Sequence, residues 1–391
     1  MASEIAKYAT LTEAAFCVSM GHRIVEGEGV GQAMIKTGLQ VLLRERRDLM
    51  SGRRVGLLTH SAAVQPDLTG TRDALLGAEV EATALIDLQE GDTAGALCAA
   101  QLAAVDLLVV DLQENGARCS TVGEALFGAL QAAAGAGCPM IVLDRPNPSG
   151  GALVEGPVAE PGFVPCAGGA GLPMRHGLTL GEMAGYLNEE CGLGATLTVI
   201  GMRGWRRAMY FDDAGLPWVP LEPGLRSLVA ALLYPGTCLL DGTNLSAGAG
   251  SPFPFEVAGA PWLEGDRLAE VLNAQRLPGV RCEPLRFVPG AGRYAGEPCG
   301  GVRLRVAARG SLRPVAATLH LIAAARTQAP RRFEFLPGPA DGRAPLFDRL
   351  AGTARLRQGL EAGLSAESLV QSWEVEVARF EARRKRYLLY S

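Results

Sequence analysis

The chain has 391 residues, of which 48% are hydrophobic and 20% are charged, and its formal net charge at pH 7 is −4. This is the composition of an ordinary globular protein with a full core, and the length suits two domains of about 150 residues each. The small negative charge, together with the lack of a basic stripe interleaved with aromatic residues, argues against a nucleic-acid partner.

Targeting and metal signals are lacking from the sequence. Residues 1–29 do not have the charged start and long apolar stretch of a secretory signal, and no apolar run approaches the roughly 18 residues of a membrane helix. The nine cysteines are scattered, without the spacing of a metal site. Such dispersed cysteines are typical of reduced thiols. We therefore expect a cytoplasmic protein with no metal, no other cofactor and no membrane partner, and the sequence leaves homo-oligomer formation open.

Helix and strand patterns alternate along the first part of the chain. The spacing of apolar residues predicts a helix from 31 to about 47. Short apolar runs separated by helices then indicate βαβ units and a parallel sheet, which makes the fold class α/β. Strands are predicted at 55–59, 82–88, 106–110 and 140–143, and helices at 71–77, 94–104 and 122–134.

The pattern changes in the second half of the chain. Glycine, proline and tryptophan dominate residues 203–260 with little periodicity, so this stretch is predicted to be rich in loops, with a domain boundary near 233. The other predicted elements are a helix at 176–190, strands at 196–202, 301–307 and 332–335, a helix near 314–326 and two C-terminal helices.

Polar residues follow each of the four strands of the predicted sheet. Because the carboxyl ends of parallel strands meet at one edge, these residues would lie together, and open α/β sheets bind their ligands at that edge. The sequence therefore predicts a site made of four groups: His60 and Ser61; Gln89 and Glu90; Asp111, Gln113 and Glu114; and Asp144 and Arg145.

The segment after the third strand, DLQENGARCST (111–121), holds the strongest candidates for acid–base chemistry. A carboxylate of Asp111 or Glu114 at a strand end can act as an acid or a base if burial raises its pKa. The alternative is a structural ion pair between one of these carboxylates and Arg118. The residues alone leave both interpretations open.

Two later segments contribute further candidates. His176 precedes a predicted helix start at which Thr179 and Glu182 have the spacing of a capping box, so a capping role is the better interpretation of Glu182. The glycine-rich loop around Asn244 offers amide and hydroxyl groups suited to sugar hydroxyls, although a plain connecting loop has a similar composition. Trp262 either stacks on a sugar ring or fills the core.

Several of these segments occur together, in the same order and rough spacing, in one protein family. They are VGLLTHSAAV, DLQENGAR, VLDRPNPSGGALVEGP, PMRHGLTLGEMA, YPGTCLLDGTNLSAGAG, PFEVAGAPW and RYAGEPCGGV. On these motifs the chain resembles the NamZ-type exo-β-N-acetylmuramidases over residues 37–391. DRPNP with GTNLS is the most specific part of the resemblance.

The resemblance implies both an architecture and an activity. It implies a Rossmann-like domain over residues 37–233 after an extension over 1–36, a smaller C-terminal α/β domain over 234–391, and a cleft between the two domains. It further implies a glycosidase that removes terminal N-acetylmuramic acid from the non-reducing end of peptidoglycan fragments and needs no cofactor. The partner would be a small sugar or muropeptide.

A glycosidase of this kind needs two carboxylates flanking the scissile bond, about 5 Å apart for retention or about 6.5–9.5 Å apart for inversion. We predict Glu114 for one and Glu90 for the other, with Glu114 in the cleft near its carboxylate partner. The guanidinium group of an arginine can bind both oxygens of the sugar's lactyl carboxylate. The predicted substrate-binding residues are Asp111, Gln113, Arg118, Asp144, Arg145, Asn147, His176, Glu182, Asn244 and Glu256.

The sequence departs from the family pattern at three places that line the site. The family's Pro-Glu-His-Gly turn reads LQEG here, so its carboxylate is either shifted to Glu90 or replaced by Gln89, and the interval from Glu90 to Glu114 is shortened. The Pro-Ser-Pro-Asn run appears as LEPGL, and the arginine after GTNLS is Ala249. Two alternatives therefore stand beside the muramidase: a catalytically degenerate sugar-binding or scaffold homologue, and a hydrolase or transferase for another sugar.

Overall fold

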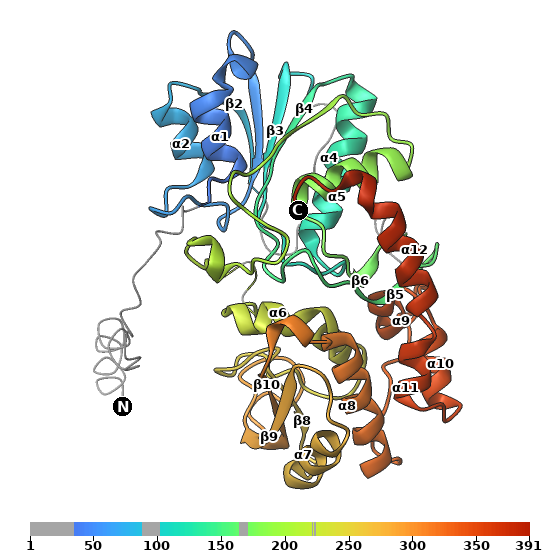
Figure 1. Cartoon of the computed structure of the whole chain (residues 1–391). Helices are drawn as coiled ribbons and strands as arrows, with labels where there is room; N and C mark the ends of the chain where they lie inside the picture. Colours follow the sequence, from blue (N-terminus) through green and yellow to red (C-terminus); the bar gives the residue numbers. More distant parts are fainter. Residues whose placement is uncertain (1–34, 88–101, 164–170, 221, 223) are drawn as a thin grey trace, which may run out of the picture. The chain divides into compact units, whose positions relative to one another are not determined.

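A five-stranded parallel sheet forms the centre of the N-terminal part of the protein (Figure 1). The structure is a computed structural model that describes residues 35–87, 102–163, 171–220, 222 and 224–391. The strand order is β2 (Ala82–Asp87), β1 (Val55–Thr59), β3 (Leu107–Asp111), β4 (Met140–Leu143) and β7 (Leu197–Ile200), and every neighbouring pair is parallel. The predicted parallel sheet and α/β fold class are confirmed.

Helices cover both faces of this sheet, which explains why its central strands are continuously apolar. In β3, Leu107 and Val109 pack with the residues of α1 (Gly38–Glu45) and α2 (Thr71–Gly77). Leu108 and Val110 pack on the opposite face with α4 (Thr121–Ala136) and α5 (Leu180–Glu190). The chain approaches the sheet closely at Gly38, where an added Cβ would lie 2.3 Å from the backbone nitrogen of Asp144. Only glycine fits there.

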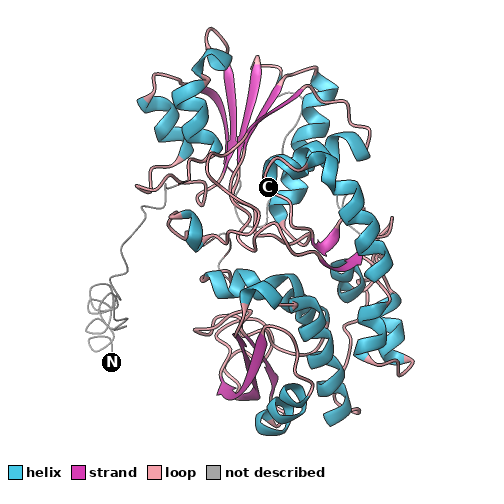
Figure 2. Cartoon of the chain, in the orientation of Figure 1, coloured by secondary structure: helices cyan, strands magenta, loops and turns pink. Residues whose placement is uncertain are grey.

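A smaller antiparallel sheet forms the core of the C-terminal part (Figure 2). Its order is β8 (Val257–Ala260), β10 (Cys299–Val306) and β9 (Val280–Phe287). The helices α7 (Gly265–Ala274), α8 (Pro314–Gln328) and α6 (Leu228–Thr237) pack around it in one apolar cluster. A two-stranded sheet of β5 (Glu155–Val158) and β6 (Pro173–Arg175) precedes this region in the chain.

The last helices return the chain to the parallel sheet. They are α9 (Leu346–Ala351), α10 (Arg355–Glu361), α11 (Ala366–Gln371) and α12 (Glu374–Arg384). Phe380 and Tyr387 belong to the same apolar cluster as Tyr186 of α5, so the end of the chain packs on the N-terminal layer. Short 3-10 helices are formed by Arg47–Met50, Asp212–Ala214, Cys238–Gly242, Arg309–Ser311 and Lys385–Tyr387.

Several predicted elements need correction. The first helix begins only at Gly38, because Thr37 and Gln40 form a capping box there, and residues 31–34 of the prediction lie outside the described part. Residues 332–335 are not a strand, since Phe335 makes only an isolated bridge with Thr243. The C-terminal region has four helices rather than two, interrupted at Gly352 and Gly363, which have positive φ. The helix predicted at 94–104 lies largely outside the described residues.

The stretch predicted to be rich in loops contains a helix and a strand, α6 and β8. Residues 230–237 of α6 are all buried, so the helix has no polar face and no periodicity to reveal it. The predicted domain boundary at 233 falls inside this helix, and the division at that position stays a prediction. No helix in the described part of the chain combines the length and apolar character needed to cross a membrane.

Candidate active site

The carboxyl ends of β1, β3 and β4 bring polar residues together, as the parallel sheet predicts. His60, after β1, accepts a 2.7 Å hydrogen bond through Nε2 from the backbone N–H of Gln113, after β3. Arg145, after β4, binds Asp111 at the end of β3, with Nε 2.5 Å from Oδ1. These contacts join three strand ends into one polar edge. Glu90, the predicted second catalytic carboxylate, lies outside the described residues, as does Gln89.

Glu114 lies buried at this edge and faces a histidine. Its Oε2 accepts a hydrogen bond from the backbone N–H of Gly116, and its Oε1 lies 3.5 Å from Nε2 of His176. Nδ1 of His176 accepts a hydrogen bond of 3.1 Å from the N–H of Leu178, so the neutral ring carries its proton on Nε2, toward Glu114. The alternative interpretation, an ion pair of Asp111 or Glu114 with Arg118, is not what the structure has, because the Arg118 guanidinium donates to three backbone carbonyls instead.

Five polar atoms at this edge are buried without a hydrogen-bond partner in the described parts of the chain. Partnerless buried polar atoms are rare in folded proteins because each has lost its contact with water, so a group of them marks a place for a ligand or an ordered water. The five atoms are Thr59 Oγ1, Gln113 Oε1, Glu114 Oε1, Ser149 Oγ and His176 Nε2.

Backbone geometry holds these groups close to one another. Gly116 has a φ of 88°, and a Cβ at this position would lie 2.7 Å from Asn147 Oδ1 and 3.0 Å from Ser149 Oγ. Asn147 donates through Nδ2 to the carbonyl of Leu178 at 2.8 Å and accepts from the N–H of Ser149 at 2.9 Å. Asn147 thus ties the Pro-Asn-Pro turn to the segment that carries His176.

The two arginines predicted to bind a lactyl carboxylate are occupied by the protein itself. Arg145 binds both oxygens of Asp111 and donates to the carbonyl of Val64 at 2.7 Å. Arg118 is buried and donates to the carbonyls of Pro157, Leu172 and Leu350 at 2.8–2.9 Å. These contacts indicate that both guanidinium groups hold the fold together.

Asp144 is fully buried and accepts four hydrogen bonds. The donors are Thr179 Oγ1 at 2.8 Å, the N–H of Gly181 at 2.8 Å, the Tyr390 hydroxyl at 2.5 Å and the N–H of Arg145 at 3.0 Å. Burial raises the pKa of Asp144 to about 6, although the bonds from Tyr390, Gly181 and Thr179 oppose this rise. Asp144 therefore connects the end of β4 to the start of α5.

Glu182 has the capping role that the sequence predicts. It forms a capping box with Thr179 at the start of α5. Its other oxygen, Oε1, binds Arg207 and the N–H of Leu389. All of these partners belong to the protein, so the contacts of Glu182 are structural.

Asn244 and Glu256 belong to a different polar group, in the C-terminal region. Asn244 donates through Nδ2 to the carbonyl of Arg332 at 2.6 Å and accepts from the N–H of Glu334 at 3.0 Å. Glu256 accepts from Ser227 Oγ at 2.7 Å and binds Arg303 at 2.8 Å. Trp262 donates to the hydroxyl of Tyr294 at 3.3 Å. None of the recorded contacts of Asn244 or Glu256 reaches Glu114.

Sequence reasoning undervalued two residues of this edge. The sequence places His60 at the predicted edge without a role, and in the structure burial and the nearby Arg145 lower its pKa to about 4, so the ring is neutral and accepts from the N–H of Gln113. Ser149 was not selected at all. Its position directly after Asp-Arg-Pro-Asn-Pro was the available signal, because that turn follows a buried strand at the sheet edge.

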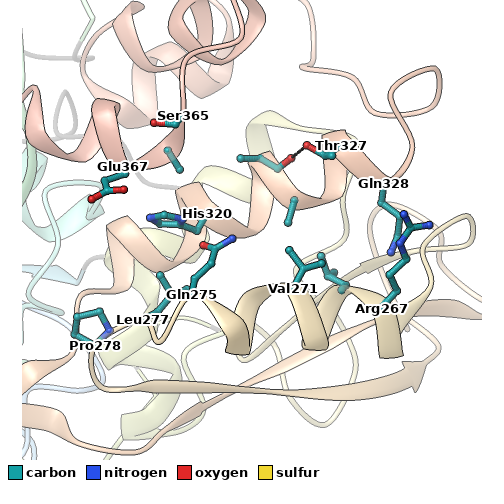
Figure 3. Close-up of a pocket in the computed structure, with 14 residues that line it drawn as sticks. Arg267, Val271, Gln275, Leu277, Pro278, His320, Thr327, Gln328, Ser365 and Glu367 are labelled. Atoms are coloured by element: carbon teal, nitrogen blue, oxygen red, sulfur yellow. Dashed lines mark hydrogen bonds between the residues drawn. The ribbon is translucent and has the colours of Figure 1, made fainter.

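Outside this edge, a groove of about 640 Å³ lies between α7, α8 and α11 (Figure 3). Arg267, Gln275, His320 and Glu367 line it together with small and aliphatic side chains. None of its lining residues belongs to the polar edge. Among the described residues, no group of three or more His, Cys, Asp or Glu side chains is arranged to hold a metal ion.

Comparison with known proteins identifies relatives along almost the whole chain. A model of the N-terminal part of exo-β-N-acetylmuramidase NamZ matches residues 93–229, and a model of its C-terminal part matches residues 232–390. The peptidoglycan β-N-acetylmuramidase NamZ of Bacillus subtilis is 35% identical over 384 residues, which cover 91% of each chain.

Two solved structures have the same fold. Both are DUF1343 family proteins of Bacteroides fragilis. One is 28% identical, with a TM-score of 0.84 over 92% of this chain and 100% of the other. The second is 24% identical, with a TM-score of 0.70 over 92% of this chain and 99% of the other, and shows the fold alone. On the family models and the Bacillus subtilis relative, this chain belongs to the NamZ exo-β-N-acetylmuramidase family.

Proposed function

We propose that this protein is a glycoside hydrolase that removes terminal N-acetylmuramic acid, or a closely related amino sugar, from peptidoglycan fragments. Family membership supports the reaction class, since the Bacillus subtilis relative is a peptidoglycan β-N-acetylmuramidase. One observation supports Glu114 as the catalytic residue. Its buried Oε1 has no hydrogen-bond partner in the described part of the chain and faces His176.

In this proposal Glu114 protonates the glycosidic oxygen as the bond to the leaving sugar breaks. Oε1 is the oxygen that would carry the proton, because Oε2 is held by the N–H of Gly116. Negative charge develops on Glu114 as the proton leaves, and a donor placed where charge develops stabilises the transition state. The Nε2–H of His176, 3.5 Å from Oε1, is such a donor.

Glu90 remains the proposed second carboxylate. In glycosidases that use two carboxylates, the second either activates a water molecule or forms a covalent bond to the sugar. Glu90 follows β2 in the sequence, and β2 pairs with β1 at the edge where His60 lies. Glu90 is therefore proposed on sequence order alone, three positions after the last residue of β2.

For sugar recognition we propose hydrogen bonds from uncharged side chains rather than an ion pair between an arginine and the lactyl carboxylate. Gln113 Oε1 can accept from a hydroxyl or an amide N–H, and Ser149 Oγ can both donate and accept. Both atoms are buried and unpaired among the described residues, whereas Arg118 and Arg145 are fully engaged. In this proposal Asp111, Asp144, Arg145, Asn147 and Glu182 support the site, and Arg118, Asn244 and Glu256 serve the fold.

The proposal is tested by incubating the purified protein with the disaccharide N-acetylmuramyl-β-1,4-N-acetylglucosamine and with longer glycan chains, between acid and neutral pH. We expect release of single N-acetylmuramic acid units from the non-reducing end, detected by mass spectrometry. Release of disaccharides would point to cleavage inside the chain, and no release from any of these substrates would contradict the proposal.

The second candidate is a sugar-binding homologue without turnover. The LQEG turn and Ala249, which replace site-lining residues of the family pattern, favour it. Calorimetry with the same disaccharide separates the two candidates. Heat of binding with an intact disaccharide at the end of the titration would support the binding protein, whereas cleavage supports the hydrolase.

A further inference from the structure

The end of the chain enters the polar edge of the N-terminal layer. We define the C-terminal segment as Leu388–Ser391; Figure 1 shows the chain ending beside α5. The N–H of Leu389 donates to Glu182 Oε1 at 2.8 Å, and the carbonyl of Ser391 accepts from the N–H of Arg207 at 2.9 Å. These contacts join the segment to the start of α5 and to the loop that follows β7.

Tyr390 is the residue of this segment that reaches furthest inward. Its ring packs edge-on against Trp205, with the ring centroids 5.0 Å apart. Its hydroxyl accepts from the N–H of Met202 at 2.8 Å and donates to Asp144 Oδ2 at 2.5 Å. Because Met202 provides a proton to the hydroxyl, the hydroxyl's own proton is directed toward the Asp144 carboxylate.

Asp144 links this hydroxyl to both halves of the candidate site. It also accepts from Thr179 and Gly181, which follow His176 by only a few residues. It directly precedes Arg145, whose guanidinium holds Asp111, and Asp111 precedes Glu114 on the same strand end. A shift of the Asp144 carboxylate would therefore move the segments that carry His176 and Glu114 relative to one another.

We propose that the C-terminal segment is a positioning element of the active site. In this proposal Tyr390 acts through Asp144 to fix the positions of the segments that carry Glu114 and His176 relative to one another. The catalytic consequence of this inference rests on the proposed function, but the mechanical coupling does not. Tyr390 is a positioning residue that does not itself contact the substrate.

Loss of the Tyr390 hydroxyl has two physical effects. It leaves the N–H of Met202 without its partner and removes one of the two hydroxyl donors to Asp144 Oδ2. It also raises the pKa of Asp144 further, because burial already raises that pKa and the Tyr390 bond opposes the rise.

The charged groups around Asp144 do not compensate for this loss. Glu182 also raises the pKa of Asp144, and the guanidinium groups of Arg145 and Arg207 are engaged by Asp111 and Glu182. Only the ionised carboxylate of Asp144 can accept from all of its donors. Without the Tyr390 hydroxyl, Asp144 therefore needs a higher pH than in the wild type to hold its remaining donors in place.

Hydrogen exchange tests the coupling independently of any activity. The variant is Tyr390→Phe, and the matched control is Tyr387→Phe, which removes a hydroxyl bonded to Glu190 near the same end of the chain. We expect severalfold faster amide exchange in residues 111–118 and 176–182 of Tyr390→Phe, and unchanged exchange there in the control. Exchange in these segments equal to wild type would overturn the proposal.

Turnover of the disaccharide tests the catalytic consequence. We expect Tyr390→Phe to lower kcat by roughly tenfold to a hundredfold, since misplacing a reacting group by about 1 Å costs about 10²-fold, with a smaller change in KM. The acid limb of its pH–rate profile should move to higher pH, and Tyr387→Phe should match wild type. An unchanged kcat and profile in an active enzyme would overturn the inference. If wild type releases no sugar, the proposed function fails, and the exchange result alone decides the coupling.

Discussion

Two polar regions of this protein look alike in sequence but differ in how their polar atoms are satisfied. At the edge of the parallel sheet, Gln113, Glu114, Ser149 and His176 each keep a buried atom without a partner in the described part of the chain. In the C-terminal region, the amide of Asn244 binds two backbone groups, and Glu256 binds Ser227 and Arg303. The first region has bonding capacity left on several residues for a ligand, whereas the side chains of Asn244 and Glu256 use theirs to hold the fold, and Arg303 Nε is the buried atom beside them that lacks a partner among the described residues.

This difference predicts which substitutions change stability and which change sugar binding. Removing a partner of a satisfied buried group leaves the other group unpaired, at a cost of about 1–3 kcal/mol. Removing an atom that has no protein partner leaves the fold intact and affects only the ligand. The following substitutions test the comparison at one position after another.

The largest loss of stability is expected for Arg118→Ala. The buried guanidinium donates to three carbonyls, and the substitution would remove one donor from each and leave a cavity, although the carbonyl of Leu172 keeps the N–H of Ala159 and the carbonyl of Leu350 keeps the Cys119 thiol. We expect the free energy of unfolding to fall by about 3 kcal/mol, because a buried acceptor that loses its partner costs about 1–3 kcal/mol and the cavity adds to that cost. Denaturant unfolding measures it. A change below about 1 kcal/mol would show that Arg118 is not structural and would return it to the list of candidate sugar-binding residues.

A smaller loss of stability is expected for Asn244→Ala. The N–H of Glu334 and the carbonyl of Arg332 would both lose their partner, and we expect a loss of about 1–3 kcal/mol. Affinity for the disaccharide, measured by calorimetry on the folded variant, should stay at the wild-type value. A large loss of affinity with unchanged stability would show that the C-terminal region binds the sugar after all.

The reverse result is expected for Ser149→Ala. Because Ser149 Oγ has no partner among the described residues, the melting temperature should remain close to wild type. A lost hydrogen bond of about 0.5–1.5 kcal/mol to the sugar corresponds to a severalfold to about tenfold rise in KM. Ser246→Ala is the matched control, since Ser246 Oγ already accepts from the N–H of Gly248. Equal KM values for the two variants would remove Ser149 from the site.

The smallest effect is expected in the pH dependence of stability. Burial raises the pKa of Asp144 from 3.8 to about 6, so the folded state holds this proton to higher pH than the unfolded state. The contribution of Asp144 to stability is therefore present below about pH 4 and is lost as the pH rises to about 6. Asp144→Asn should flatten the melting temperature over this range. The same slope in wild type and variant would contradict the raised pKa.

The sequence predicts the sheet and its polar edge because both depend on local patterns. Short apolar runs separated by helices specify a parallel sheet, and the polar residues that follow them, such as Asp111 and Asp144, then meet at one edge. The helix α6 could not be predicted this way, since its buried face extends all around it.

The state of the arginines could not be predicted from sequence, because their partners come from distant segments. The carbonyls that bind Arg118 belong to Pro157, Leu172 and Leu350, the last of them 232 positions away. An arginine at a strand end therefore has the same appearance in sequence whether it is free or fully bonded. For the same reason, the contact between Tyr390 and Asp144 has no local signal, since the two residues lie 246 positions apart.

The central claim is that Glu114 is the catalytic carboxylate, and Glu114→Gln tests it most directly. Glutamine keeps the shape and can still accept from Gly116, but it cannot donate the proton, so we expect turnover of the disaccharide to fall by about 10²–10⁴-fold, with the melting temperature nearly unchanged. Glu124→Gln, at a half-buried carboxylate in the helix that follows the site loop, is the matched control and should retain wild-type turnover. Wild-type turnover in Glu114→Gln would contradict the account.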